Sequence, residues 1–449
     1  MREKKFKFFF FTIHHHHLAT FKKKNNKLEE MGNSLNKKVT STQLPVVNLL
    51  STPLSKEEEI KIIVQHWIRI SNIKLGWINN FDKLVVNYAA ILFIFDTFCL
   101  SSKLLKTFSG HSNNVWSIDY STLDDMHLLC SGSGDRTVRV WDMETNRQIQ
   151  LFNKHSESVF CVKFSSYHYY NHRLNVICSS SFDNTIRFWD FKNNQQLQLF
   201  NEQVGWIGGI EFSPFNGGRY LCSGSADNTI RLWDVETYKS LHIFDGHNGV
   251  IRRIAISPLQ SNNNNNSNNI GVIGGNGYTI CSGSSDKTIR IWDIETTKQL
   301  TLFKGHENCV YGVKYASNGL GTIGCSNTIL SGSEDKSVRL WDIRSSKQIQ
   351  VFNGHKGIVW AVEYSPFAVA NSEIYFNSNV ICSGSSDNTI RFWDIRSNKN
   401  QLYMIKGDNK EYGGILCLKF LQLKKNNNEF DCDINLCYGS LSGLIHIWG

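Results

Sequence analysis

The sequence SGSEDKSVRLWD at residues 331–342 returns as SGSSDNTIRFWD at residues 383–394, with seven of the twelve residues identical. The dipeptide Trp-Asp that ends both stretches occurs six times, and Trp448 supplies a seventh tryptophan one residue before the last. An aspartate lies six residues before each of the first six tryptophans, and a serine lies ten residues before each. This fixed spacing indicates an internal structural repeat.

Each repeat reads as four short strands separated by turn residues. The strands of the sixth repeat are KQIQVF (347–352), IVWAVEY (358–364), NVICSGS (379–385) and TIRFWD (389–394). Apolar and polar residues alternate in them, and β-branched residues are frequent, which is typical of strands. Gly354-His355 and Ser386-Asp387-Asn388 supply turns between them. No helical period competes with this pattern.

Four strands per unit with Gly-His and Trp-Asp marks resemble the WD40 β-propeller family over about residues 103–449. The resemblance implies an all-β, seven-bladed propeller in which one His, Ser, Asp and Trp of each blade form a hydrogen-bonded chain. The complete sets are His111, Ser131, Asp135 and Trp141; His155, Ser179, Asp183 and Trp189; His247, Ser282, Asp286 and Trp292; His306, Ser331, Asp335 and Trp341; and His355, Ser383, Asp387 and Trp393. The third repeat has Gln203 in place of histidine, and the seventh has Tyr438 and Ser442 in place of serine and aspartate.

The order of strands predicts how the propeller closes. The chain stops after the third strand of the seventh blade, and Lys103–Phe108 (KLLKTF) matches an outer strand without a repeat before it. We therefore expect Lys103–Phe108 to pair antiparallel with Leu444–Trp448, because a propeller does not leave an open sheet edge.

Three segments are expected along the chain. Residues 1–54 have the composition of a disordered basic low-complexity tail and linker, and residues 101–449 form the propeller. Residues 55–100 are expected to be a short helical extension, because Ser55 and Glu58 form a capping box before an apolar helical stripe. This extension either packs on the propeller or serves as a dimerisation or docking element.

The net charge of +9 does not indicate a nucleic-acid-binding surface. Residues 1–38 hold ten Lys and Arg against three Glu, so the other 411 residues carry only +2. A duplex-binding protein needs its basic residues clustered on the folded part. The longest apolar run, Tyr88–Phe95, is too short for a transmembrane helix, which needs about 20 residues.

No catalytic or cofactor motif is found. The chain contains no GxSxG, no GxxxxGK[ST], no HExxH and no dinucleotide fingerprint, and His168 and His172, close together in an expected loop, are a weak basis for a metal site. Six of the twelve cysteines occupy one repeat position and no CxxC pair exists, which favours packing in a reducing compartment. We expect no enzyme activity, no cofactor and no metal, and a cytoplasmic location with the nucleus as the alternative.

The sequence instead favours a protein-protein interaction scaffold that binds proteins or peptides. In the WD40 family, partners often touch the narrower face at three positions per blade: three and five residues after the histidine, and just before the turn aspartate. Aromatic residues and arginine, which dominate binding energy at interfaces, gather at these positions here. The predicted partner-binding residues are Trp116, Phe160, Phe182, Trp206, Arg252, Tyr311, Glu334 and Trp360. The competing interpretation is that some of these side chains only pack between inner strands.

A second motif suggests an alternative function. Trp341-Asp342-Ile343-Arg344 and Trp393-Asp394-Ile395-Arg396 resemble the WDxR signature of propellers that are substrate receptors of cullin-RING ubiquitin ligases. The resemblance implies that Arg344 and Arg396 contact the ligase adaptor. An arginine after Trp-Asp is also common as a solvated residue, so the motif alone leaves both interpretations open.

Overall fold

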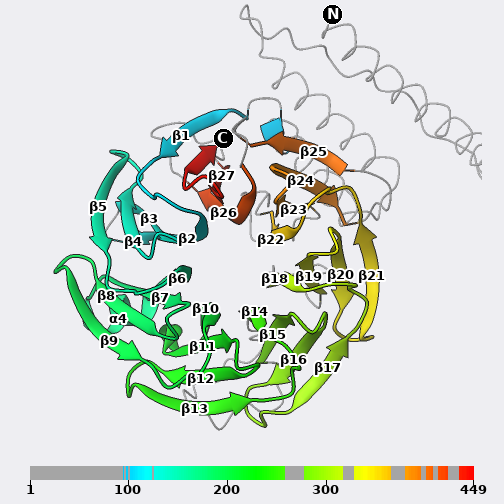
Figure 1. The fold of residues 1–449 in the computed structure, drawn as a ribbon, viewed down its shortest axis with the longest axis horizontal. Coiled ribbons are helices and arrows are strands. Elements are labelled where there is room, and N and C mark those ends of the chain that lie inside the picture. Colours follow the sequence, from blue (N-terminus) through cyan, green and yellow to red (C-terminus); the bar gives the residue numbers. More distant parts are fainter. Residues whose placement is uncertain are drawn as a thin grey trace, which may run out of the picture. The chain divides into compact units, whose positions relative to one another are not determined.

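The computed structural model describes residues 95, 98–99, 102–123, 126–257, 278–316, 328–365, 380–395, 401–407, 413–422 and 434–449. Within these ranges the strands form seven antiparallel sheets of four, arranged around a central axis (Figure 1). The predicted all-β, seven-bladed propeller is confirmed. The predicted tail at 1–54 and the helical extension at 55–100, except for three residues of the latter, lie outside the described residues.

Each blade runs from an inner strand at the axis to an outer strand at the rim. Blades one to three are β2 (Val115–Leu123), β3 (Met126–Ser133), β4 (Val138–Asp142) and β5 (Arg147–Phe152); β6 (Val159–Phe164), β7 (Val176–Ser181), β8 (Ile186–Asp190) and β9 (Gln195–Phe200); and β10 (Ile207–Phe212), β11 (Tyr220–Ser225), β12 (Ile230–Asp234) and β13 (Lys239–Phe244). Blades four to six are β14 (Ile251–Ile256), β15 (Thr279–Ser284), β16 (Ile289–Asp293) and β17 (Gln299–Phe303); β18 (Val310–Tyr315), β19 (Thr328–Ser333), β20 (Val338–Asp342) and β21 (Lys347–Phe352); and β22 (Val359–Tyr364), β23 (Val380–Ser385), β24 (Thr389–Asp394) and β25 (Gln401–Lys406).

Blade seven joins the two ends of the propeller. It contains β26 (Ile415–Gln422), β27 (Ile434–Ser440), β28 (Ile445–Trp448) and, as its outer strand, β1 (Leu104–Phe108). Strand β1 pairs antiparallel with β28, with Leu104 opposite Trp448 and Phe108 opposite Ile445. The predicted closure is confirmed.

The sequence repeat and the structural blade are offset by one strand. The segment KQIQVF that opens the sixth repeat is β21, which pairs with β20 in blade five. Each repeat thus begins with the outer strand of the preceding blade. Because of this offset, each sequence repeat contributes strands to two neighbouring blades.

The core lies between neighbouring blades. One cluster joins Leu128 and Val138 of blade one to Val159 and Val162 of blade two, and all four side chains are buried. The glycine of the recurring Ser-Gly-Ser makes room for this contact, because a Cβ atom on Gly132 would lie 2.7 Å from Val159 Cγ1. Packed radially in this way, the blades cover each other's apolar faces.

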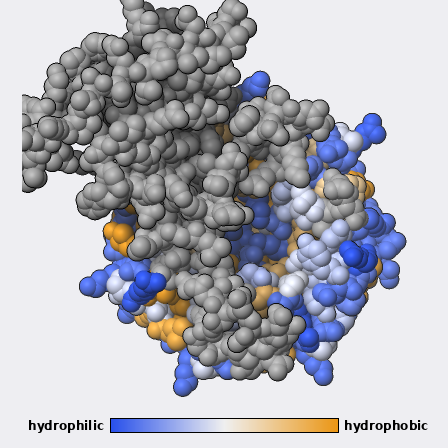
Figure 2. All heavy atoms as spheres, turned by 180° about the vertical axis from the view of Figure 1, so that it is seen from behind, coloured by the Kyte–Doolittle hydropathy of each residue, from blue (hydrophilic) through white to orange (hydrophobic). Residues whose placement is uncertain are grey.

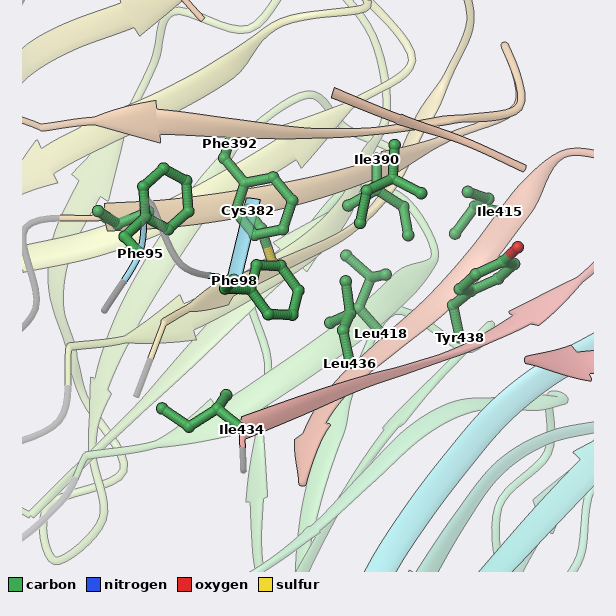
Figure 3. Packing of buried hydrophobic residues seen from close by; sticks show 12 residues of the cluster. Phe95, Phe98, Cys382, Ile390, Phe392, Ile415, Leu418, Ile434, Leu436 and Tyr438 are labelled. Carbon is green, nitrogen blue, oxygen red and sulfur yellow. The ribbon is translucent and has the colours of Figure 1, made fainter. Parts of the chain in front are cut away.

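Part of the predicted helical extension packs on the propeller. Phe95, Phe98 and Cys99 are helical, and the two phenylalanine rings lie 5.5 and 6.0 Å from the ring of Phe392 in β24 (Figure 3). They belong to a cluster that also includes Leu436 of β27, so this segment contributes to the boundary between blades six and seven. The predicted helices within residues 55–90 lie outside the described residues, so their packing or docking role stays a prediction.

A belt of alternating charges crosses the inner strands. It takes one position from each blade in turn: Asp119, Lys163, Glu211, Ala255, Lys314, Glu363 and Lys419. Salt bridges join Lys163 to Glu211 at 2.7 Å, Lys314 to Glu363 at 3.2 Å and Lys419 to Asp119 at 2.8 Å. In a closed ring with an odd number of positions, charges cannot alternate in sign all the way round. The neutral Ala255 lies between Glu211 and Lys314, where a charge of either sign would meet a like charge.

The belt charges shift each other's ionisation. Burial alone would lower the pKa of Lys163, but Glu211 and Asp119 raise it above the ordinary lysine value. Burial would likewise raise the pKa of Asp119, and Lys419 and Lys163 lower it instead. Both groups are therefore charged at neutral pH, and the opposite charges of the belt offset the cost of burying them.

One insertion between blade strands is helical rather than irregular. The predicted loop that contains His168 and His172 is helix α4 (Ser166–His172), which contacts the 3-10 turn η1 (Asn216–Gly218) of blade three. His168 is buried and its Nδ1 lies 2.7 Å from Ser165 Oγ. The described residues contain no group of three or more His, Cys, Asp or Glu arranged to hold a metal ion. Nor does any helix among them have the length and apolar character needed to cross a membrane.

Candidate partner-binding site

A β-bulge at the start of every inner strand builds the candidate site. In blade one, Val115 pairs with Ser133 and Ser117 pairs with Gly132, which leaves Trp116 as the extra residue between them. The same register shift occurs in the other six blades. A bulge redirects the side chain that it carries. The bulged residues are Trp116, Phe160, Gly208, Arg252, Tyr311, Trp360 and Leu416.

The two other predicted positions lie beside the bulge in each blade. A backbone hydrogen bond joins the residue before the turn aspartate to the residue two positions before the bulge, as from Phe182 N to Ser158 O and from Glu334 N to Cys309 O, both at 2.9 Å. The same bond is present in all seven blades. The three positions therefore meet at one end of the strands, on what we call the aspartate-turn face.

Six side chains contact one another in a closed circuit on this face. The ring centroids of Trp116 and Phe160 are 5.4 Å apart, and those of Phe160 and Trp206 are 5.3 Å apart. The guanidinium of Arg252 lies 4.9 Å from the Trp206 ring and 5.1 Å from the Tyr311 ring. The ring centroids of Tyr311 and Trp360 are 4.2 Å apart, and those of Trp360 and Trp116 are 5.6 Å apart. With Phe182, these six residues form what we call the mouth cluster.

Blades three and seven contribute differently. A Cβ atom on the bulged Gly208 would lie 3.2 Å from the Trp206 ring and 2.9 Å from Ile251 O, so glycine leaves the space that Trp206 occupies. In blade seven the bulged Leu416 is buried, and the circuit passes directly from Trp360 to Trp116.

The remaining predicted residues border the cluster. Phe182 stacks on Trp206 with ring centroids 5.5 Å apart, and its side chain is 46% exposed. Glu334 is close enough to Tyr311 for its charge to act on the phenol. Burial raises the pKa of Tyr311, the positive charge of Arg252 lowers it, and the negative charge of Glu334 raises it further. The structure thus brings all eight predicted residues together. Trp116, Phe160, Trp206, Arg252, Tyr311 and Trp360 are half-buried, so they pack against each other and keep one side open.

The His, Ser, Asp and Trp chain holds the turns that carry this face. In blade four, His247 Nδ1 lies 2.7 Å from Asp286 Oδ2, His247 Nε2 lies 2.7 Å from Ser282 Oγ, and Trp292 Nε1 donates to Ser282 Oγ at 2.8 Å. Blades one, two, five and six contain the same set of bonds. Burial lowers the pKa of His247, although the hydrogen bond to Asp286 and the negative charge of Asp286 act to raise it. Burial would raise the pKa of Asp286, but hydrogen bonds from His247 and Thr288 hold it well below the ordinary value.

Blade three keeps only half of this chain. Ser223 donates to Gln203 Oε1 at 2.8 Å, and Trp233 donates to Ser223 at 2.8 Å. Gln203 Nε2 is buried and meets no acceptor among the described residues, and Asp227 accepts only from Thr229. In blade seven, the buried Tyr438 packs against His446 at a centroid distance of 4.9 Å.

This difference predicts unequal effects of two matched substitutions. Asp286→Ala removes an acceptor for His247, Asn248 and Thr288, so the free energy of unfolding is expected to fall by about 1–3 kcal/mol. Asp227→Ala removes only the acceptor of Thr229 and is expected to cost less. A urea titration of both variants measures the two losses, and equal losses would contradict a four-residue network.

The predicted adaptor residues are on the other side of the propeller. Strand β20 runs away from the aspartate-turn face and ends at Asp342, so Arg344 lies at the opposite face, where it is exposed. The backbone N–H of Arg344 donates to Asp342 Oδ1 at 3.1 Å. Arg396 lies outside the described residues.

The fold and the repeated polar chain define a class of protein: a seven-bladed β-propeller whose blade turns are tied down by His, Ser, Asp and Trp. The family model of the WD domain, G-beta repeat, matches residues 102–142, 146–190, 196–234, 238–293, 297–342 and 346–394, which is more than half of the chain. The chain belongs to this WD40 family. The match ends at residue 394, before the strands β26, β27 and β28 of blade seven, where two of the recurring polar residues are replaced.

Similarity to curated proteins is confined to short stretches. The chain is 35% identical over 83 residues to WD repeat-containing protein pop1 of Schizosaccharomyces pombe, and 34% identical over 86 residues to cell division control protein 4 of Saccharomyces cerevisiae. It is 38% identical over 64 residues to eukaryotic translation initiation factor 3 subunit I of Xenopus tropicalis. These matches cover 18%, 19% and 14% of this chain and 10%, 10% and 19% of the relatives. Relatives with such different names fit a general interaction scaffold.

Proposed function

We propose that this protein is a non-catalytic scaffold that binds a protein or peptide partner at the mouth cluster. One observation carries the proposal: six side chains from six blades, five of them aromatic, touch in a closed circuit and remain half-buried. Tryptophan, tyrosine and arginine are the residues most enriched at binding hot spots. Because they also hold each other in place, little side-chain entropy is lost when a partner binds.

Inner-strand packing alone does not account for this arrangement. A residue that only fills the space between blades is buried, as Leu416 is in blade seven. Phe182 adds a largely exposed ring beside Trp206, on a turn rather than on a strand. An exposed aromatic surface on a soluble protein favours a contact with another molecule.

Trp360→Ala and Trp116→Ala are expected to weaken capture of the principal partner by about 30-fold, since a hot-spot aromatic contributes at least about 2 kcal/mol. The partner is first recovered with the full chain by affinity purification from the native cell and identified by mass spectrometry. Tyr170→Ala, which removes a 68% exposed ring from α4, is the matched control and should bind normally. Thermal melting of each variant separates lost binding from lost folding, and unchanged capture by both tryptophan variants would contradict the proposal.

The ligase-receptor function is a second proposal that uses a different surface. Arg344 is exposed on the face opposite the mouth cluster, so an adaptor and a substrate would not compete for the same residues. The double substitution Arg344→Ala and Arg396→Ala should then abolish recovery of a cullin adaptor while other partners remain. Recovery of the same partners with and without the two arginines would exclude this function.

A further inference from the structure

Arg252 is the one positive charge in the contact circuit of the mouth cluster, and its surroundings are unusual. Its guanidinium lies between the rings of Trp206 and Tyr311, at 4.9 and 5.1 Å, and Nε donates to Ser285 Oγ at 3.0 Å. The two rings and the hydroxyl fix the plane of the guanidinium. Among the residues that the structure describes, no carboxylate forms an ion pair with it.

This environment leaves the hydrogen-bonding edge of Arg252 available. A guanidinium offers five N–H groups in a planar fork, and among the described residues only the Nε–H of Arg252 has an acceptor, Ser285 Oγ. Such a fork binds a carboxylate through two parallel hydrogen bonds, which are stronger than neutral ones. The neighbouring Arg253 is used differently, because its Nη2 donates to Trp116 O at 3.1 Å and so links blade four to blade one.

The position of Arg252 disfavours a cationic ligand. The guanidinium already occupies the space between the rings of Trp206 and Tyr311, where a cation would bind.

The amount of charge distinguishes a carboxylate from a phosphate. Phosphate groups, with nearly two negative charges, are generally bound by clusters of arginines. The mouth cluster offers a single guanidinium, that of Arg252, to bind an anion. Glu334 in the neighbouring turn adds a negative charge beside Tyr311. One unpaired positive charge with an acid nearby is better matched to a carboxylate.

We propose that the mouth cluster binds a peptide segment in which an Asp or Glu side chain lies beside apolar residues, with its carboxylate on the guanidinium of Arg252 and its apolar neighbours on the aromatic rings. This deepens the proposed function and rests on it. Arg252 determines which segments bind, and Glu334 limits the affinity by repelling the ligand carboxylate.

A peptide selection with the full chain tests this proposal. A random 12-residue peptide library displayed on phage is panned against the purified protein, and enriched sequences are synthesised and measured by fluorescence anisotropy. We expect the enriched sequences to share an Asp or Glu next to aliphatic or aromatic residues. Replacing that acid by its amide should weaken binding about 10- to 100-fold, the range for a hydrogen-bonded charged group.

Variants of the protein assign the effect to Arg252. Arg252→Gln should lose the same factor, and Arg252→Lys should recover only part of it, because the charge returns without the planar fork. Glu334→Gln should tighten binding, whereas Arg147→Gln, an exposed arginine on β5, is the charge-matched control and should not change it. A phosphoserine in place of the ligand acid should bind no better than the carboxylate.

The outcomes separate this proposal from the function on which it rests. Peptides that need Trp116 and Trp360 but not Arg252, or that lack a common acid, would overturn carboxylate recognition and leave the binding site in place. Clearly tighter binding of the phosphoserine peptide would also overturn it. Acidic peptides whose affinity is unchanged in Trp116→Ala and Trp360→Ala would overturn the location of the site itself.

Discussion

A chain that starts at residue 110 is expected to aggregate or remain unfolded, because it lacks β1 and exposes the edge of β28 along the whole outer side of blade seven. Strand β1 supplies the four register pairs from Leu104–Trp448 to Phe108–Ile445. An unpaired strand edge is a template for intermolecular pairing. Size-exclusion chromatography and circular dichroism of the refolded protein measure the outcome.

A start at residue 102 is the matched control for this experiment. It keeps β1 but removes Phe95 and Phe98, so it separates the closing strand from the packing of the preceding segment on Phe392. We expect this protein to be soluble and folded with a lower melting temperature. Cooperative unfolding of a soluble 110–449 protein would contradict the role of β1 in closure.

Lys163→Met is expected to lower the free energy of unfolding by about 1–3 kcal/mol, the usual cost of leaving a largely buried polar group without its partner. Its ammonium is 2.7 Å from Glu211 and also compensates Asp119, and its side chain is only 15% exposed. The substitution therefore removes the salt bridge of Glu211, whereas Asp119 keeps its salt bridge with Lys419 at 2.8 Å.

Lys314→Met provides the comparison at the same position of another blade. Its salt bridge with Glu363 is longer, at 3.2 Å, its side chain is 34% exposed, and the adjacent blade four has Ala255 at the belt position. We expect a loss of about 1 kcal/mol, as for a surface pair. Guanidinium chloride titrations at matched ionic strength measure both values, and equal losses would mean that the belt does not act as a connected set of charges.

Much of the fold was predictable because its determinants are local and repeat in the sequence. The spacing from Asp335 to Trp341 recurs in each of blades one to six, and the unmatched outer strand at Lys103–Phe108 required a partner at the other end of the chain. The departures of blade three were also visible, since Gln203 replaces the histidine, and its amide nitrogen meets no acceptor in the part of the chain that the structure describes.

The features that were not predicted depend on register and on contacts between blades. The bulge that directs Trp116 toward the mouth cluster is a mismatch of one residue between β2 and β3, and sequence alternation does not report it. The charge belt joins residues such as Lys419 and Asp119, which are 300 positions apart. Comparing the seven inner strands position by position would have revealed the alternating signs. The helix α4 was missed because it spans only seven residues.

Radical footprinting of the protein with its captured partner tests the central claim, that the mouth cluster is the binding surface, most directly. Hydroxyl radicals oxidise exposed aromatic side chains, and mass spectrometry reports the extent at each residue with and without the partner. We predict protection of Phe182, Trp206, Tyr311 and Trp360, and unchanged oxidation of Tyr170 on the opposite face. Protection of Tyr170 or of the Asp342–Lys347 turn, with the mouth cluster as reactive as in the free protein, would contradict the account.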